Sequence, residues 1–348
     1  MQSRLYPPSF KGRSPNASPE MGDEYADDFE PDTSEVSPPD AASPPAAAFA
    51  TVDFSSLRLG KTRGGGAFAI VSEAVWSPSC RAVAVKQLAD AGARDDLLAE
   101  LRALCNAGRH PNIVELIGAS LGARPALVLE LLGPSLAEGG LTKRASAGVA
   151  LGWAADVAAA VAHLHSRTPA PVLHRDIKTA NVLLRARADG GAAVLCDFGL
   201  AGSRTRGAGT PAYLAPELWA AAAPGAGGVD DGGFSRAADV YALGATMFSI
   251  LSGDEPWRGE SLADIRTAVL RGDRPPAFRV RSDVGSDVRD LIARAMAQAP
   301  GDRPTASAIA HALAAAAARA RKETASASAA PVDALDALGA AVTASKRR

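Results

Sequence analysis

The side chains best suited to phosphate chemistry lie in two short stretches, His174-Arg175-Asp176-Ile177-Lys178-Thr179-Ala180-Asn181 and Asp197-Phe198-Gly199. A carboxylate such as that of Asp176 can orient a hydroxyl group, and the ammonium of Lys178 can steady a phosphate. The oxygens of Asn181 and Asp197 are of the type that Mg²⁺ prefers. Each residue alone is more often a solvated surface residue than a functional one, so the prediction rests on their joint spacing.

A second set of residues indicates a nucleotide-binding side to the same site. Gly64-Gly65-Gly66 precedes a predicted strand, and glycines let a backbone approach phosphates closely. In the next predicted strand, Val83-Ala84-Val85-Lys86, alternation places Ala84 and Lys86 on one face. The small alanine leaves room for a flat purine, and the lysine can reach phosphates. The bland alternatives are a flexible turn and a surface lysine.

The predicted helix over Asp95–Gly108 carries an acidic residue on its apolar face. Glu100 lies three residues after Leu97 and four before Leu104, so it shares their face. A carboxylate in that position is unfavourable without a cation. Lys86 is the expected partner, and this pairing argues against the interpretation of Lys86 as a surface residue.

The elements that position these residues change in type along the chain. Strands are predicted over Ala67–Val75, Arg81–Leu88 and Ala126–Leu131, with one helix between the second and the third. From about Val149 onward, apolar residues recur with a 3.6-residue period. The predicted helices are Ala154–His165, Asp239–Ser252, Asp287–Gln298 and Thr305–Arg319. The predicted fold class is α+β, with a β-rich part and a helical part around a cleft.

The two chemical stretches are expected to lie side by side. Asp189-Gly190-Gly191 separates two apolar strands, Val182–Leu184 and Ala193–Cys196. A hairpin formed by these strands would bring the loop before the first strand next to the loop after the second.

Taken in order, these motifs resemble those of eukaryotic-type protein kinases. The resemblance covers about residues 54–318 and implies a bilobal fold. A small β-rich N-lobe with one helix would span about 54–130, and a larger helical C-lobe about 134–318. Further matches are His110-Pro111-Asn112-Ile113-Val114, Gly209-Thr210-Pro211-Ala212-Tyr213-Leu214-Ala215-Pro216-Glu217, Asp239-Val240-Tyr241-Ala242-Leu243-Gly244 and Gly301-Asp302-Arg303-Pro304-Thr305. In the family, the residues matching Glu217 and Arg303 form a buried ion pair.

The resemblance also implies roles for the chemical residues. Asp176 would be the catalytic base, Lys178 would stabilise the transferring phosphate, and Asn181 would complete the catalytic set. Asn181 and Asp197 would hold Mg²⁺. Leu129 would be the gatekeeper, next to the hinge between the lobes. The residues implied to surround ATP are Gly64, Gly66, Ala69, Val71, Ala84, Lys86, Glu100, Leu129, Glu130, Leu132, Leu183 and Asp197.

The glycine-rich segment departs from the family pattern at two positions. Ala69 replaces the third glycine, and Arg63 stands where the family usually has an aliphatic residue above the nucleotide. Leu59 would fill that place instead if the loop were longer.

The implied activity is transfer of the γ-phosphate of ATP to Ser or Thr hydroxyls of protein substrates in intracellular signalling. The position of Lys178 and the Gly209–Glu217 segment favour Ser/Thr specificity, and dual specificity is an alternative. Leu116-Ile117-Gly118-Ala119-Ser120 leans toward the tyrosine-kinase-like group. The rival from another class is a pseudokinase scaffold. We also hypothesise that a phosphate on Ser203 or Thr205, received by Arg175, switches activity.

The composition of the chain limits the classes of partner and the cellular compartment that we expect. The formal net charge of −1 gives no indication of nucleic acid or of an anionic membrane as a partner. The apolar stretch over 145–165 is interrupted by Asp156, so no membrane span is expected. Three unclustered cysteines fit a reducing compartment. The cytosol is expected, or the nucleus in view of the terminal Lys346-Arg347-Arg348.

The ends of the chain are predicted to lie outside the folded domain. Residues 1–53 are rich in Pro, Ser and acidic residues and are expected to be a disordered tail. Residues 319–348 are predicted to be a low-complexity C-terminal tail. The N-terminal tail would be a solvated linker or a docking arm for a partner protein. The Ala/Gly-rich segment 220–233 is expected to be a surface insertion.

Overall fold

The computed structural model describes residues 49–65, 69–77, 79–88, 94–186, 191–201, 209–222, 234–276 and 279–328. Several predictions concern residues outside these ranges. They include the tail up to residue 48, Gly66, the proposed phosphorylation positions Ser203 and Thr205, residues 223–233 of the insertion, and the C-terminal segment from residue 329.

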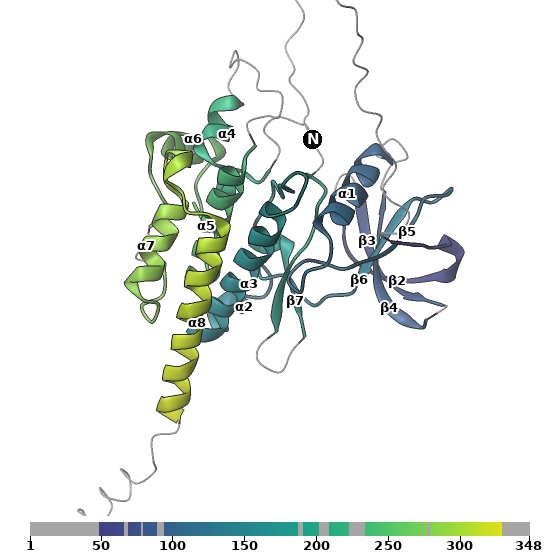
Figure 1. Ribbon diagram of the computed structural model, residues 1–348, viewed down its shortest axis with the longest axis horizontal. Coiled ribbons are helices and arrows are strands. Elements are labelled where there is room, and N and C mark those ends of the chain that lie inside the picture. The colour runs from purple at the N-terminus through teal and green to yellow at the C-terminus, as the bar shows by residue number, and fades with distance from the viewer. Residues whose placement is uncertain are drawn as a thin grey trace, which may run out of the picture. The chain divides into compact units, whose positions relative to one another are not determined.

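The predicted β-rich N-lobe is confirmed: in the residues that the structure describes it is a six-stranded sheet with one α-helix (Figure 1), although only three of the strands were predicted. The strand order is β1-β5-β6-β4-β3-β2, antiparallel except for β1 and β5. The elements are β1 (Ala50–Thr51), β2 (Leu57–Gly65), β3 (Ala69–Trp76), β4 (Arg81–Leu88), helix α1 (Arg94–Ala107), β5 (Leu116–Ser120) and β6 (Ala126–Glu130). Alternation along β4 sends Val83 and Val85 into a small core on one face of the sheet. Lys86 therefore lies on the opposite face, together with Ala84.

The sheet begins inside the segment predicted to be a tail. Ala50 and Thr51 pair with β5, and Val52 is buried. At the crossing, a Cβ added to Gly118 would lie 2.5 Å from the carbonyl oxygen of Ala50, so a glycine is needed there. The predicted boundary after residue 53 is thus too late. A strand of two residues is too short to produce a recognisable apolar alternation within a polar, proline-rich segment, so it was not predicted.

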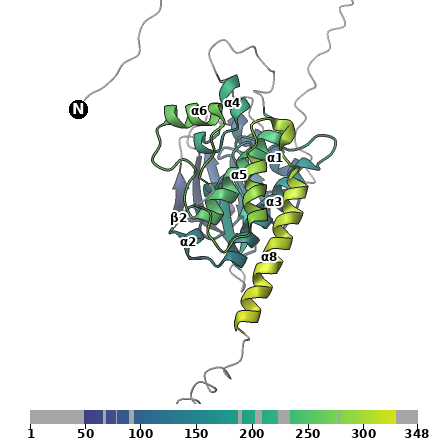
Figure 2. The same ribbon diagram turned by 90° about the vertical axis from the view of Figure 1, so that its left-hand side faces the viewer.

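In the described residues the C-lobe is mainly helical (Figure 2), with one short hairpin. Its elements are α2 (Leu141–Arg144), α3 (Ala147–His165), β7 (Val182–Arg185), β8 (Ala192–Leu195), α4 (Pro216–Ala221), α5 (Arg236–Ser252), α6 (Leu262–Arg271), α7 (Ser286–Ala295) and α8 (Ala306–Ser328). The predicted hairpin is present as β7 and β8. The large core is formed mainly by α3, α5, the hairpin and the apolar faces of α7 and α8.

Helix α3 lies at the centre of this lobe and packs against α5, α8 and β8. It begins at Ala147, seven residues before the predicted start, where the Ser146 side chain accepts a hydrogen bond from the Val149 amide. Its length and composition would allow a membrane crossing, but 61% of its apolar window is buried inside the protein. A core helix surrounded by other elements meets the same criteria, because it is apolar on every side.

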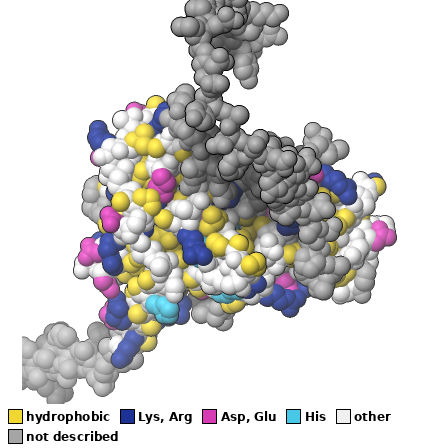
Figure 3. Space-filling model, turned by 45° about the horizontal axis from the view of Figure 1, so that its top comes forward, with side chains coloured by type: hydrophobic (Ala, Val, Ile, Leu, Met, Phe, Trp, Pro, Cys, Tyr) yellow, Lys and Arg dark blue, Asp and Glu magenta, His cyan; other side chains and the backbone are white. Residues whose placement is uncertain are grey.

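Helix α8 continues to Ser328, beyond the predicted end at Arg319. The residues between them contain neither proline nor glycine, and they include the good helix formers Ala, Arg, Lys and Glu. The low complexity of this segment therefore does not prevent a helix, and part of the predicted C-terminal tail is helical. On the face shown in Figure 3, basic and acidic side chains are interspersed, in keeping with the net charge near zero.

Candidate active site

The loop from His174 to Asn181 is held in place by two buried side chains, those of Asp239 and His174. The carboxylate of Asp239, on α5, accepts the amide hydrogens of His174 and Arg175, each at 2.9 Å. The His174 ring is fully buried, with Nε2 3.0 Å from the Cys196 carbonyl oxygen and Nδ1 accepting the Asp176 amide. A neutral ring protonated on Nε2 satisfies both contacts, and burial lowers the pKa of His174, which favours that neutral form.

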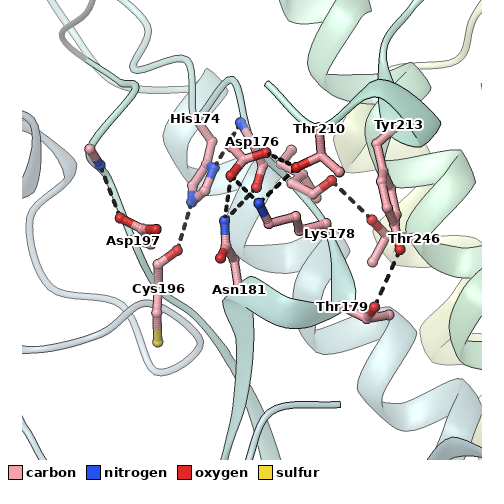
Figure 4. A network of polar contacts seen from close by, with 12 residues as sticks. His174, Asp176, Lys178, Thr179, Asn181, Cys196, Asp197, Thr210, Tyr213 and Thr246 are labelled. Atoms are coloured by element: carbon pink, nitrogen blue, oxygen red, sulfur yellow. Dashed lines mark hydrogen bonds and ion pairs between the residues drawn. The ribbon is translucent and has the colours of Figure 1, made fainter. Parts of the chain in front are cut away.

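Asp176 stands at the centre of a polar network (Figure 4). Its Oδ2 accepts hydrogen bonds from Lys178 Nζ at 2.6 Å and from Asn181 Nδ2 at 2.9 Å. Its Oδ1 accepts the Thr210 hydroxyl at 2.8 Å, and Lys178 Nζ also reaches that hydroxyl oxygen at 2.7 Å. The three predicted catalytic residues are therefore brought together. Thr210 closes the ring of contacts by linking Asp176 to Lys178.

The loop after β8 lies beside this network. The Cys196 amide donates to the Asn181 carbonyl oxygen at 2.8 Å, which places Asp197 next to the catalytic loop. Asp197 has a positive φ of 63°, and its side chain is 49% exposed. Burial would raise the pKa of Asp197, but the adjacent Lys86 ammonium holds that pKa below its usual value. Asp197 is therefore anionic at neutral pH and suited to bind a cation.

Lys86 links the two lobes. Its Nζ lies 2.7 Å from both carboxylate oxygens of Glu100 on α1 and 2.8 Å from Asp197 Oδ1. Burial would lower the pKa of Lys86, but the two carboxylates raise it overall. Burial raises the pKa of Glu100, which Lys86 opposes. The predicted Lys86–Glu100 pair is formed, and the lysine reaches Asp197 in addition.

The remaining nucleotide-side residues lie along neighbouring strands. Lys86 stands opposite Val71, and Ala84 stands between Glu73 and Leu129. Directly opposed residues in a sheet share a face, so the predicted residues Val71, Ala84, Lys86 and Leu129 lie on one face. Four other residues predicted to surround ATP lie nearby in the chain's elements. Gly64 is opposite Val71, and Ala69 is the first residue of β3. Leu183 is half-buried on β7, and Leu132 is buried after β6.

Arg63 and Leu59 lie on opposite faces of the N-lobe sheet. Leu59 stands opposite Ala74, whose side chain is in the core on the other face of the sheet. Irregular register between Leu59 and Gly64 brings Arg63 to the face that carries Lys86, where its Nε lies 2.5 Å from Glu73 Oε1. Arg63, and not Leu59, therefore lies on the same face of the sheet as Lys86.

Several contacts around the site were not predicted from the sequence. The Glu130 carboxylate binds the Arg185 guanidinium through both oxygens, at 2.5 and 3.0 Å, which ties the end of β6 to β7. An open cavity of about 360 Å³ lies behind this pair and is lined by residues such as Cys105 and Pro111, away from Lys86 and Asp176. No spacing rule links residues 55 positions apart, so this pair left no signal in the sequence.

The predicted ion pair of the helical lobe is present. Arg303 donates to both carboxylate oxygens of Glu217, at 2.6 and 2.8 Å, and its side chain is fully buried. It also donates to backbone carbonyls of Ala237, Ala297 and Gln298, so its donors are well satisfied. The pair fixes the start of α4 to the segment before α8, and with it the loop that carries Thr210.

The protein kinase domain family matches residues 57–313 of this chain. The chain belongs to the protein kinase family. Among its relatives is mitogen-activated protein kinase kinase kinase 7 from Homo sapiens, which is 30% identical over 75% of this chain and 42% of its own length. The corresponding protein of Drosophila melanogaster is 29% identical over 75% of this chain and 37% of its own length.

A bacterial relative is similar to about the same degree. The serine/threonine-protein kinase PknK of Mycobacterium tuberculosis is 34% identical over 70% of this kinase chain and 22% of its own length. The family match confirms the predicted protein kinase family. The chain spans less than half the length of the relatives it matches.

Proposed function

We propose that the chain is an ATP-dependent protein kinase that phosphorylates Ser and Thr hydroxyls of protein substrates. The observation that carries the proposal is the contact of Lys86 with both Glu100 and Asp197, at 2.7 and 2.8 Å. It joins the nucleotide strands to the catalytic loops, where Asp176 already contacts Lys178 and Asn181. The groups that would act on one nucleotide are therefore assembled.

The oxygen donors of the two loops fit a bound Mg²⁺. Asp197 is anionic and half-exposed, and Asn181 uses its amide nitrogen to bond Asp176, which leaves its side-chain oxygen for a cation. Within the described ranges no group of three or more His, Cys, Asp or Glu residues is arranged so that it could hold a metal ion by itself. A site with few protein ligands suits Mg²⁺, which keeps several waters and is shared with substrate phosphates. When bound, the ion would neutralise charge on the polyphosphate.

The chain's own residues would then align the reactants. Asp176 would accept the proton of the incoming Ser or Thr hydroxyl and orient its oxygen toward the γ-phosphate. Lys178 would stabilise the negative charge that develops on the transferring group. Lys86 would hold the non-reacting phosphates, with Glu100 fixing the position of its ammonium. Alignment and charge neutralisation account for most of the catalysis of this reaction.

A transfer assay tests the proposal. Full-length protein with Mg²⁺ and γ-labelled ATP should label a generic Ser/Thr substrate, and analysis of the labelled amino acids should show phosphoserine and phosphothreonine. The Asp176→Asn variant should lose this activity. Phosphotyrosine alongside these two products would identify a dual-specificity kinase. Absence of transfer by the wild type, with nucleotide binding retained, would instead establish a scaffold.

The remaining proposals concern regulation, partners and place. We infer that Ser203 or Thr205 is a regulatory phosphorylation site and that residues 1–48 are a docking arm for protein partners. A docking test should delete residues 1–48 only, because Ala50 and Thr51 belong to the sheet. Loss of a partner with unchanged activity on a generic substrate is the expected result.

We propose that the protein is located in the cytosol or the nucleus, and imaging of a tagged protein would test this.

A further inference from the structure

An ion pair between β2 and β3 lies on the nucleotide-facing side of the N-lobe sheet. Arg63 Nε is 2.5 Å from Glu73 Oε1. In the register of β3 and β4, Glu73 stands opposite Ala84, and Val71 stands opposite Lys86. Directly opposed residues of antiparallel strands have side chains on the same face. Glu73, and with it the arginine it binds, therefore shares the face of Ala84 and Lys86.

The register also shows which end of the nucleotide this pair would meet. Lys86 contacts Asp197 and so marks the phosphate end. Ala84, two residues away, stands opposite Leu129, next to the last residue of β6, and so marks the purine end. Because Glu73 is level with Ala84 and not with Lys86, the guanidinium of Arg63 lies at the purine end. Leu59, on the other face of the sheet, does not compete for this position.

The fold does not need this pair for stability. The side chains of Arg63 and Glu73 are 45% and 34% exposed, and exposed pairs of this kind contribute about 0–1 kcal/mol. A guanidinium is planar and weakly hydrated, and it stacks on aromatic rings more readily than an ammonium does. Glu73 neutralises the arginine and ties it to β3, away from the phosphate end. The geometry thus gives a flat cation beside the place of a flat aromatic ligand.

We propose that Arg63, anchored by Glu73, covers one face of the purine and so is a nucleotide-binding residue. The proposal rests on the ATP-dependent function proposed above and adds a contact to it. The contact is made with the base, so it should be the same for adenosine, ADP and ATP. A contact with the phosphates would instead grow with the charge of the ligand.

Calorimetric titration of the full chain with adenosine, ADP and ATP tests this. The two variants compared are Glu73→Gln and the double variant that adds Arg63→Ala. The Glu73→Gln background is used because removal of Arg63 alone would leave the Glu73 carboxylate unpaired. The double variant should bind all three ligands about threefold to tenfold more weakly than Glu73→Gln alone, the range of a partly desolvated cation–π contact. In the wild-type background, Arg63→Ala should weaken ATP more than adenosine, because Glu73 is left unpaired near the nucleotide.

The matched control is Arg81→Ala. Arg81 pairs with Glu115 in the same sheet at 2.9 Å, with side-chain exposures of 46% and 30%, and it stands opposite Trp76, which packs on the core of the other face. This variant should bind all three ligands as the wild type does. Thermal unfolding of each variant verifies that it is folded.

Three results would overturn the inference. Equal affinities with and without Arg63 would show that it does not touch the nucleotide. A loss confined to ADP and ATP would assign the contact to the phosphates. A similar loss in Arg81→Ala would show an indirect effect of the sheet. If the wild type binds no nucleotide at all, the proposed function fails as well, whereas normal binding and transfer by Arg63→Ala would leave that function intact.

Discussion

In the C-lobe, the groups that hold the catalytic loop are buried and fully engaged. Asp239 is 2% exposed and accepts two backbone amides of that loop. In the N-lobe, Arg63 and Glu73 are joined to each other by one short contact, and their side chains are 45% and 34% exposed. The first arrangement holds a loop in one position, while the second leaves a side chain able to adjust to the ligand that we propose for it. Only the first should be essential to the fold.

The largest effect expected from this comparison is loss of stability on breaking the buried pair of the C-lobe. Arg303→Leu leaves Glu217 without its cation and three backbone carbonyls without their donor. Removing one partner of a buried ion pair costs about 3–5 kcal/mol. Denaturant unfolding should show a loss of that size. A loss below about 1 kcal/mol would mean that this pair does not organise the lobe.

A smaller effect is expected at the bridge between the base and the lysine. Thr210→Val keeps the shape of the side chain but removes the hydroxyl that contacts Asp176 Oδ1 and Lys178 Nζ. A hydrogen bond to a charged group contributes about 1.5–3 kcal/mol, so the rate of transfer should fall about tenfold to a hundredfold. Thr210→Ser keeps the hydroxyl and should stay close to the wild type. Equal loss in both variants would point to packing as the cause.

The buried histidine predicts a pH dependence of stability. The pKa of His174 is lowered by burial, so the unfolded chain binds a proton more readily than the folded one. Stability should therefore be complete above the unfolded histidine pKa of about 6.5 and fall as the pH drops below it. His110, whose pKa is also lowered, contributes with the same sign. Urea midpoints at pH 7.5 and 5.5 test this, and His174→Asn should show a smaller difference between them.

The smallest effect is expected at an exposed pair far from the site. Arg319 contacts Asp287 at 2.5 Å, but both side chains are more than half exposed. Exposed pairs contribute at most about 1 kcal/mol. Arg319→Leu should therefore leave transfer unchanged and shift the unfolding free energy by no more than that. A loss as large as that of Arg303→Leu would erase the contrast between buried and exposed pairs.

Local patterns predicted which of the candidate residues lie together, and their chemical roles stay a prediction. Strand alternation and helix spacing were sufficient to pair Lys86 with Glu100, because each rule acts within one element and only one acidic residue faced the core there. The hairpin between the two loops followed from its turn residues. Contacts between distant segments were different. Nothing in the sequence linked Glu130 to Arg185, and the two-residue strand β1 was too short to stand out.

The position of Arg63 shows a second kind of limit. Alternation alone could not choose between Arg63 and Leu59, because the choice depends on irregular register between β2 and β3. Each irregularity moves the following side chains to the other face of a sheet. Backbone irregularities of this type depend on the packing of the neighbouring strand, so they appear only in the folded structure.

The central claim is that Asp176 acts in the chemical step while the nucleotide is held by other residues. It is tested most directly by measuring, for Asp176→Asn and the wild type, both the dissociation constant of ATP and the single-turnover rate of transfer. We expect the dissociation constant to change by less than about twofold and the rate to fall by about 10²–10⁴-fold, the usual contribution of a general base. Transfer at the wild-type rate by the variant would contradict the account.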